Sequence, residues 1–262
     1  MKTFSLAALL IAALLTGGCA TVNGPSAKID PLESFNRASY AFNDTVDKAV
    51  LKPVAQGYQA VTPSFVRAGI TNAFDNVGDV KTALNNLLQG KVGEAASDAG
   101  RVVVNTVLGV FGLWDVATPM GLEKHEEDFG QTLGKWGVGS GPYLVLPLLG
   151  PSTLRDGVGR IPDSYAGYNY HIDHRRTANS LFVTEIINGR ANLLAAEKTL
   201  DEAALDKYTF LRDAYLQRRL RSVYDGKVPQ AKLDELEDSL EPAAPATTAP
   251  AAAPAKAEPD KK

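Results

Sequence analysis

Residues that could bind a metal or carry out acid–base chemistry gather in two short segments of this 262-residue chain. His171 and His174 lie three positions apart with Asp173 between them, a spacing that could place two imidazoles on one zinc ion. No third ligand stands nearby at helical spacing, so we expect a surface loop rather than a metal site. The run His125-Glu126-Glu127-Asp128 is expected to be a solvated cluster of charges rather than a catalytic acid pair.

A serine flanked by glycines, Gly139-Ser140-Gly141, could suggest the nucleophile elbow of a lipid hydrolase. That motif requires glycine two positions before and two after the serine. Val138 and Pro142 occupy those positions here, and no phosphate-binding or dinucleotide motif is found elsewhere. We therefore predict that the protein is not an enzyme and needs no cofactor or metal.

The only cysteine, Cys19, carries the clearest chemistry in the chain. It ends a segment with Lys2 and an apolar stretch over residues 4–15, which is typical of a secretory signal peptide and too short to span a bilayer. Cysteine at this place resembles a lipobox, in which the sulfur receives a diacylglycerol. Thr16 departs from the usual large aliphatic residue, and the alternative is an ordinary signal peptide with a free thiol.

The chain divides into four parts on composition. Residues 1–18 are expected to be the signal peptide and residues 19–29 a tether that begins at the acylated cysteine. Residues 30–228 are long enough for one folded body, and residues 229–262, acidic and then rich in Ala and Pro, are expected to be disordered. A net charge of −3 argues against nucleic acid as a partner. Ala20 after the cysteine favours the outer membrane.

Helical signals dominate the folded body, and no alternating pattern supports a sheet, so the predicted fold class is all-α. Asp30-Pro31-Leu32-Glu33 has the pattern of a capping box, and Pro53 is expected to close the helix that follows. Further helices are expected from residue 62, from residue 79 to Gly90, and over residues 91–106, 152–157, 175–201 and 206–224. In the last of these, Arg212, Arg218, Arg219 and Arg221 are assigned to the polar side.

Residues 102–116 are almost entirely apolar. They are too few to cross a bilayer as one helix. Two interpretations remain open: a buried core helix followed by a turn, or an apolar segment at membrane depth that does not cross. Under the second interpretation, together with the apolar stretch after Pro142, the membrane-embedded candidates are Val110, Phe111, Leu113, Trp114, Leu144 and Leu146.

Residues 129–151 are so rich in glycine and proline that we expect a structured loop or hairpin rather than a long helix. Five segments then resemble the MlaA (VacJ) family of outer-membrane lipoproteins. They are DPLESFNRASYAFND (30–44), NNLLQGK (85–91), RVVVNTVLGVFGLWDVA (101–117), EDFGQTLGKWGVGSGPYLVLPLLGPSTLRDGVG (127–159) and LRDAYLQRR (211–219).

The resemblance implies a ring-like helical body embedded in one leaflet of the outer membrane, next to a trimeric porin. It implies that the protein removes mislocalised phospholipids from the outer leaflet and passes them through a central channel to a periplasmic lipid carrier, which maintains lipid asymmetry. The alternative is a non-catalytic acylated scaffold that organises porins or the envelope. As a mobile wall of the channel we propose the segment with Trp136, Gly137, Gly139, Gly141, Pro142 and Tyr143.

Overall fold

The computed structural model describes residues 28–203 and 206–241, so the signal peptide, Cys19 and the Ala/Pro-rich end of the chain lie outside the described residues. The described part is mostly helical, which confirms the predicted class. Its helices are α2 (Glu33–Val46), a π-helical turn (Asp47–Leu51), α3 (Lys52–Val61), α4 (Ser64–Leu88), α5 (Val92–Val107), a 3-10 turn (Thr118–Met120), α6 (Phe129–Lys135), α7 (Leu154–Ala166), α8 (Tyr168–His171), α9 (Arg175–Ala203), α10 (Lys207–Val223) and α11 (Gln230–Leu240).

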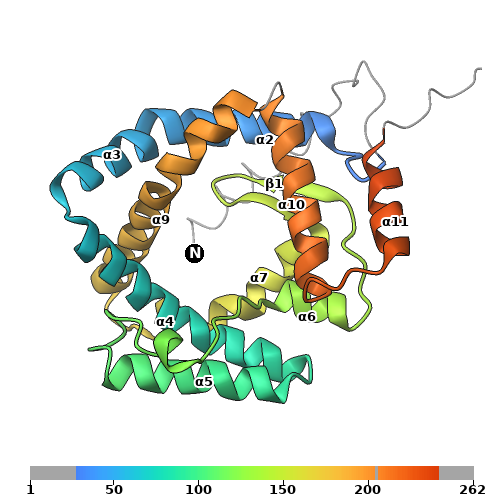
Figure 1. The fold of residues 1–262 in the computed structure, drawn as a ribbon. Coiled ribbons are helices and arrows are strands. Elements are labelled where there is room, and N and C mark those ends of the chain that lie inside the picture. Colours follow the sequence, from blue (N-terminus) through green and yellow to red (C-terminus); the bar gives the residue numbers. More distant parts are fainter. Residues whose placement is uncertain (1–27, 204–205, 242–262) are drawn as a thin grey trace, which may run out of the picture.

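The helices are arranged as a ring (Figure 1). Helices α2 and α3 follow one side, α4 turns back along the next, and α6, α7 and α10 close the opposite side. Helix α5 is paired with α4, and α9 with α3. A two-stranded antiparallel hairpin, β1 (Tyr143–Leu146) and β2 (Gly150–Thr153), lies between α2 and α10 with Tyr143 paired to Thr153.

Two expected helix ends are wrong. Pro53 does not close a helix but lies in the first turn of α3, so that helical structure continues from residue 33 to 61. The π-helical turn directly before α3 already changes the hydrogen-bond register, which accommodates a residue without an amide donor. Helix α4 also runs unbroken through Gly78, because one glycine in a 25-residue helix weakens it by only about 1 kcal/mol.

The glycine-rich region is more regular than expected. Its first seven residues form α6, for which Asp128 is the N-cap and accepts from the amide of Gln131 at 2.8 Å. The hairpin follows, as predicted, and α7 then extends well past the expected end at residue 157 despite Pro162. The region is therefore a short helix followed by a hairpin rather than a single long loop.

The apolar core is small. It consists of Tyr143, Val145, Tyr208 and Leu216, with Tyr215 packed against it. The expected N-cap, Asp30, is instead fully buried beside this cluster, where it accepts hydrogen bonds from Asn36 Nδ2 at 2.7 Å and from Tyr208 Oη at 2.5 Å. The helix begins after Leu32. The hydrogen bond from Tyr208 connects Asp30, at the start of the folded body, to α10.

The ends of the folded body also differ from the prediction. Residues 230–240, expected to be disordered, form α11, which lies outside the ring (Figure 1). Lys28 and Ile29, expected to be tether, contact this helix: the Ile29 amide donates to the Ser239 carbonyl at 3.0 Å, and Lys28 pairs with Asp238 at 2.8 Å. The Ile29 carbonyl accepts from the Tyr143 amide at 2.9 Å. Both ends therefore belong to the body.

Candidate functional site

Two cavities lie between helices from different sides of the ring, with volumes of about 400 and 510 Å³. Their walls combine charged groups with aromatic rings, as in sites that bind amphipathic molecules. We call them the ring cavities. Residues of α4, α9, α10 and the α6 N-cap line both: Phe74, Gly78, Lys81, Asp128, Glu185, Tyr215 and Arg219.

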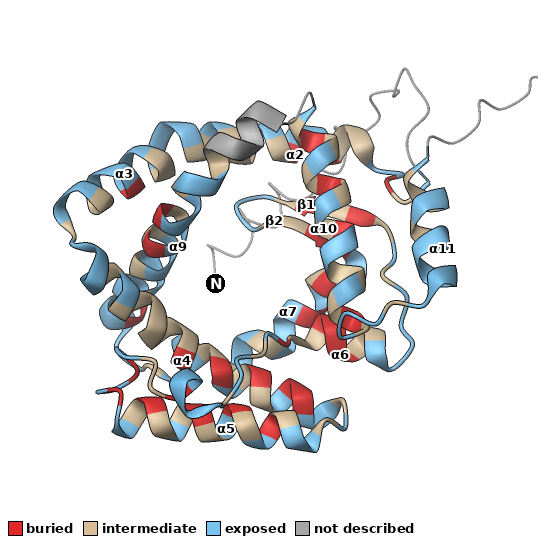
Figure 2. Cartoon of the chain, viewed as in Figure 1, coloured by how far each residue is buried: buried red, intermediate tan, exposed pale blue. Residues whose placement is uncertain are grey.

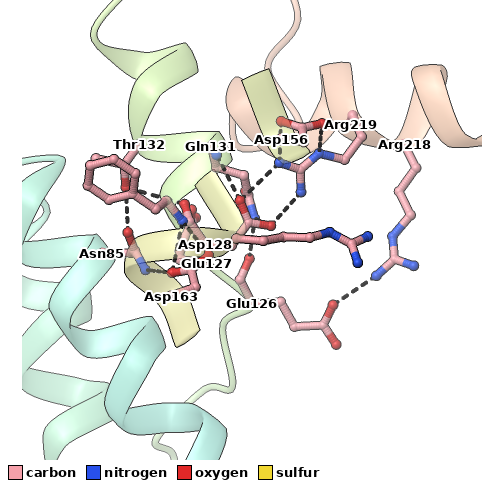
Figure 3. A network of polar contacts seen from close by, with 12 residues as sticks. Asn85, Glu126, Glu127, Asp128, Gln131, Thr132, Asp156, Asp163, Arg218 and Arg219 are labelled. Atoms are coloured by element: carbon pink, nitrogen blue, oxygen red, sulfur yellow. Dashed lines mark hydrogen bonds and ion pairs between the residues drawn. The ribbon is translucent and has the colours of Figure 1, made fainter. Parts of the chain in front are cut away.

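Arg219 of α10 joins α6 and α7 at the wall of these cavities (Figure 3). It donates two hydrogen bonds to Asp128, at 2.6 and 2.9 Å, and two to Asp156, both at 2.9 Å. Burial alone would raise the pKa of Asp128, but Arg219 outweighs it and lowers that pKa to about 2. The pKa of Asp156 is also lowered, since Arg219 again outweighs burial. Both carboxylates stay charged and hold three helices together.

A second polar group connects α4 to α6 and α7 (Figure 3). The Asp163 carboxylate accepts from the Phe129 amide at 3.0 and 3.1 Å and from Asn85 Nδ2 at 3.1 Å. Asn85 Oδ1 in turn accepts from Thr132 Oγ1 at 2.8 Å. Burial raises the pKa of Asp163, and its hydrogen bonds lower that pKa by less. These contacts close the ring between helices distant in sequence.

The acidic run at residues 125–128 is therefore not the solvated cluster that we expected. Glu127 is only 7 % exposed and accepts from Lys91 Nζ at 3.0 Å, while His125 Nδ1 lies 2.8 Å from a carboxylate oxygen of the buried Asp98. Only Glu126, paired with the exposed Arg218, matches the expectation. The α10 arginines do not share one polar surface, because Arg212 and Arg219 are in buried or half-buried ion pairs, whereas Arg218 and Arg221 are exposed.

The contact between α4 and α5 is polar. The buried guanidinium of Arg101 donates to Asp79 Oδ2 at 3.1 Å and to the Leu122 carbonyl at 2.7 Å. Asn86 Nδ2 donates to Asp98 Oδ2 at 2.7 Å. We call this contact the polar seam. Burial raises the pKa of Asp79, and the hydrogen bond from Arg101 lowers that pKa by less.

The opposite faces of these helices are exposed (Figure 2). Large apolar side chains lie on them. Among the described residues, 19 polar or charged residues are buried, against 10 apolar ones. Such a distribution is the reverse of that in water-soluble domains and marks surfaces that contact lipid or a partner. One exposed stripe of α4 consists of Val77, Val80, Leu84 and Leu87, and one of α7 consists of Leu154, Val158, Ile161 and Tyr165.

The apolar run at residues 102–116 continues this pattern: it is a helix followed by a turn, as one interpretation expected, but it is not a buried core segment. Helix α5 ends at Val107, and the turn after it is exposed, with Phe111 at 81 %. Val110 and Phe111 have positive φ angles of 52° and 57°, which bulky residues rarely adopt. The buried Asn105 holds the turn, because its Oδ1 accepts from the amides of the next two residues after Asp115 at 2.8 and 2.9 Å.

All four membrane candidates in this turn are exposed: Val110, Phe111, Leu113 and Trp114. Leu144 and Leu146 of β1 are half-buried, and the hairpin exposes Leu148 and Leu149 instead. Over residues 28–203 and 206–241, no helix has both the length and the apolar character needed to cross a bilayer.

None of the six residues proposed as a mobile wall lines either ring cavity. Gly137 and Gly139 line a third cavity of about 360 Å³, bounded by α10 and α11, and Arg219 lines this cavity too. Gly137 and Gly141 have positive φ angles of 93° and 66°, which favour glycine, whereas Gly139 does not.

Trp136 and Pro142 flank these glycines. Trp136 is half-exposed, and its Nε1 donates to the Leu88 carbonyl at 3.1 Å, while the Pro142 carbonyl accepts from the Leu154 amide at 3.1 Å. Tyr143 was placed wrongly as a channel residue: it is 1 % exposed and packs in the core next to Tyr208.

Two asparagines of α2, one heptad apart, hold the hairpin. Asn36 donates to the Tyr143 carbonyl at 3.0 Å and accepts from the Val145 amide at 2.8 Å. Asn43 donates to the Leu146 carbonyl at 3.0 Å and accepts from the Leu148 amide at 2.7 Å. Side-chain amides thus replace the missing neighbour strand along β1. Sequence reasoning missed this role, because the hairpin lies more than 100 residues from Asn36 and Asn43 and nothing local marks the contact.

The two histidines with metal-like spacing contact different partners. His171 Nε2 lies 3.0 Å from the Tyr165 carbonyl, and His174 Nδ1 lies 3.0 Å from Thr177 Oγ1. The described ranges contain no group of three or more His, Cys, Asp or Glu residues that could hold a metal ion.

Known proteins are similar to this chain in sequence and in fold. The MlaA lipoprotein family model matches residues 28–222. An intermembrane phospholipid transport system lipoprotein of Escherichia coli is 34 % identical over 218 residues, covering 81 % of this chain and 86 % of its own length. The corresponding lipoprotein of Haemophilus influenzae is 31 % identical, covering 92 % and 98 %.

An uncharacterized protein of Rickettsia bellii is 36 % identical over 79 % of this chain and 81 % of its own length. A solved structure from work on the maintenance of bacterial outer membrane lipid asymmetry superposes with a TM-score of 0.65 at 36 % identity. It covers 74 % of this chain and 98 % of the solved chain. By sequence and by fold, the chain belongs to the MlaA lipoprotein family.

Proposed function

We propose that this protein removes mislocalised phospholipids from the outer leaflet of the outer membrane and passes them through the ring cavities to a periplasmic carrier, maintaining lipid asymmetry without catalysis. The observation that supports this most is a ring whose outer faces are apolar and whose interior cavities carry charged groups beside aromatic rings. A phospholipid has the same two-part character. The relatives named for intermembrane phospholipid transport favour this function over an envelope scaffold or a lipid hydrolase.

The same distribution supports attachment to the membrane at two places. Acylated Cys19 would anchor the N-terminus. The exposed turn with Phe111 and Trp114 and the exposed stripes of α4 and α7 would enter one leaflet. Moving these apolar side chains from water into hydrocarbon would contribute a favourable free energy of about 25 cal/mol per Å² of buried apolar surface.

A trimeric porin and a soluble carrier are the partners that we infer from the family. Exposing the two acyl chains of a phospholipid to water costs about 0.8 kcal/mol of free energy per CH₂ group. A phospholipid therefore cannot cross an aqueous compartment unassisted. A carrier that shields the chains would therefore have to receive lipid from this ring. The porin would hold the ring within the outer membrane.

Filling the ring cavities tests transport against the scaffold function. Gly78 lines both cavities, and a Cβ atom there would meet nothing within 4 Å. We expect Gly78→Phe to raise outer-leaflet phospholipid and detergent sensitivity in cells to the level of a deletion. Gly93→Phe is the control, since Gly93 is also helical with open space around it but lines neither cavity. Normal lipid asymmetry with Gly78→Phe would contradict transport and favour a scaffold.

The proposed mobile wall at residues 136–142 is tested by comparing substitutions at its three glycines. Valine at Gly137 or Gly141 is strained by the positive φ angle, whereas Gly139 has ordinary φ and open space. We expect Gly137→Val and Gly141→Val to impair lipid transport and Gly139→Val to leave it nearly unchanged, measured by outer-leaflet phospholipid. Wild-type transport by all three variants would exclude a mobile wall here.

Membrane attachment of the body is tested without the anchor. A protein that lacks residues 1–18 and carries Cys19→Ser should still float with phospholipid vesicles. Phe111→Asp combined with Trp114→Asp should reduce flotation at least about tenfold, because each buried aromatic contributes about 1.5–3 kcal/mol. Leu233→Asp on α11, outside these faces, is the matched control. Equal flotation of all three proteins would show that this turn does not enter the membrane.

A further inference from the structure

The larger ring cavity, of about 510 Å³, contains charges of both signs. Three of its charged side chains are already in ion pairs: Arg219 binds both Asp128 and Asp156, and Asp156 also pairs with Arg155 at 3.0 Å. These groups have no free capacity for another ion. The remaining charged groups of the wall are therefore those that decide which ligand the cavity accepts.

Four such groups remain: Lys81, Arg160, Asp163 and Glu185. Within the described part of the chain, none of them is in an ion pair. The Lys81 amine has no hydrogen-bond acceptor there, and the Arg160 guanidinium donates only to the Pro151 carbonyl at 3.4 Å. Two cations and two anions thus face one cavity without an opposite charge in contact.

An aromatic pair lies beside one of the anions. Phe74 of α4 and Tyr168 of α8 have ring centroids 5.8 Å apart, and both line the cavity. Tyr168 Oη donates to Glu185 Oε2 at 2.5 Å, which holds the carboxylate at the edge of the aromatic pair. The second oxygen, Glu185 Oε1, accepts no hydrogen bond within the described ranges. Aromatic faces together with a carboxylate are the usual surroundings of a bound ammonium group.

We propose, resting on the lipid-transport function above, that this cavity selects headgroups that carry both a phosphate and an ammonium, as in phosphatidylethanolamine, over net-anionic headgroups. Lys81 and Arg160 bind the phosphate, and Glu185, Phe74 and Tyr168 bind the ammonium. A phosphatidylglycerol headgroup satisfies the two cations but leaves the Glu185 carboxylate without a counter-charge, whereas Asp163 already accepts from the Phe129 amide and from Asn85 with either lipid. Selectivity therefore arises mainly on the acidic side of the cavity.

The test uses the full acylated protein, purified in detergent and incubated with vesicles of equal phosphatidylethanolamine and phosphatidylglycerol. The protein is recaptured, and its bound lipids are quantified by mass spectrometry. We expect about three- to fivefold enrichment of phosphatidylethanolamine, the range of a partly exposed ion pair. Glu185→Gln should bring the ratio to about one. Lys81→Ala with Arg160→Ala should lower both lipids and keep the ratio. Glu237→Gln on α11, outside the cavity, is the control.

The outcomes separate this inference from the function on which it rests. A wild-type protein that captures no phospholipid contradicts lipid transport itself. Capture at the vesicle ratio, or unchanged enrichment in Glu185→Gln, overturns headgroup selection alone. Because Glu185 is exposed and in no ion pair, its replacement should leave folding intact, which circular dichroism of the same samples verifies. Free glycerophosphoethanolamine in excess should not displace the bound lipid if the acyl chains are also held.

Discussion

The α4–α5 pair and the cluster around β1 and α10 distribute polar and apolar side chains in opposite ways. Between α4 and α5, the buried residues are charged or amide-bearing, such as Asp79 and Arg101, and the valines and leucines are exposed. Around β1, Tyr143, Val145 and Leu216 are buried, as in a water-soluble domain. Both regions pair their buried charges, but only the second has an apolar interior.

This difference indicates that the two regions are built for different surroundings. A helix pair with a polar contact gains little from the hydrophobic effect in water, since its apolar side chains stay exposed. In lipid, the same pair would be stable because charges and amides meet away from hydrocarbon. The β1–α10 cluster needs no such surroundings. The ring thus combines a side suited to lipid with a side that folds by ordinary burial.

The largest expected effect is at the polar seam. Arg101→Ala leaves the buried Asp79 without its partner, so we expect a loss of about 3–5 kcal/mol in the free energy of unfolding, measured with urea in mild detergent. Lys124→Ala, which breaks the exposed pair with Asp75, should cost under about 1 kcal/mol. A double variant with leucine at both Arg101 and Asp79 should be more stable than Arg101→Ala. The opposite order would contradict our interpretation of the seam.

Two leucine truncations compare the regions directly. Leu216→Ala removes a 4 % exposed side chain from the core and should cost about 3 kcal/mol. Leu87→Ala removes a 57 % exposed one from the α4 stripe and should cost less than about 0.5 kcal/mol in the same urea titration. Similar losses for both would mean that the exposed stripe of α4 is covered in the folded protein.

The Arg219 contacts predict a pH dependence. The pKa of Asp128 is about 2 in the folded protein and about 3.9 when unfolded, so its contribution is complete above about pH 4 and disappears as the pH falls toward 2. Between pH 5 and 2.5, wild-type stability should fall by about 2 kcal/mol more than that of Asp128→Asn. Asp75→Asn, which removes an exposed carboxylate, should follow the wild type. Parallel curves for wild type and Asp128→Asn would exclude this linkage.

The smallest expected effect concerns the hairpin. Asn43→Ala removes the acceptor for the Leu148 amide and the donor to the Leu146 carbonyl, at a cost of about 1 kcal/mol confined to the hairpin tip. Hydrogen exchange at Leu148 should accelerate about fivefold, while exchange in α10 stays unchanged. Asn36→Ala should affect the other end of β1 instead. Uniform acceleration across the chain would show that the hairpin does not open locally.

Much of the helical structure could be predicted from periodicity. The helices expected at residues 175–201 and 206–224 match α9 and α10 within two residues, and the hairpin lies where glycine and proline become frequent. The network around Arg219 could not be predicted, because its partner Asp128 is 91 residues away and nothing local marks the pair. Tyr143 was misplaced for the same reason: its neighbour Tyr208 lies on a distant helix.

The sequence by itself determined the helical class, the family, the cysteine expected to carry the anchor and the shortness of the apolar segments. Those properties depend on local spacing and composition, which one chain displays directly. Only the tertiary structure decided which face of each helix is inside. Periodicity separates the polar face of α4 from its apolar face, but the buried face is selected by partners such as Arg101 and Asp98 on α5. Long-range pairing of charges, absent from any local pattern, placed the polar residues inside and left the apolar ones exposed.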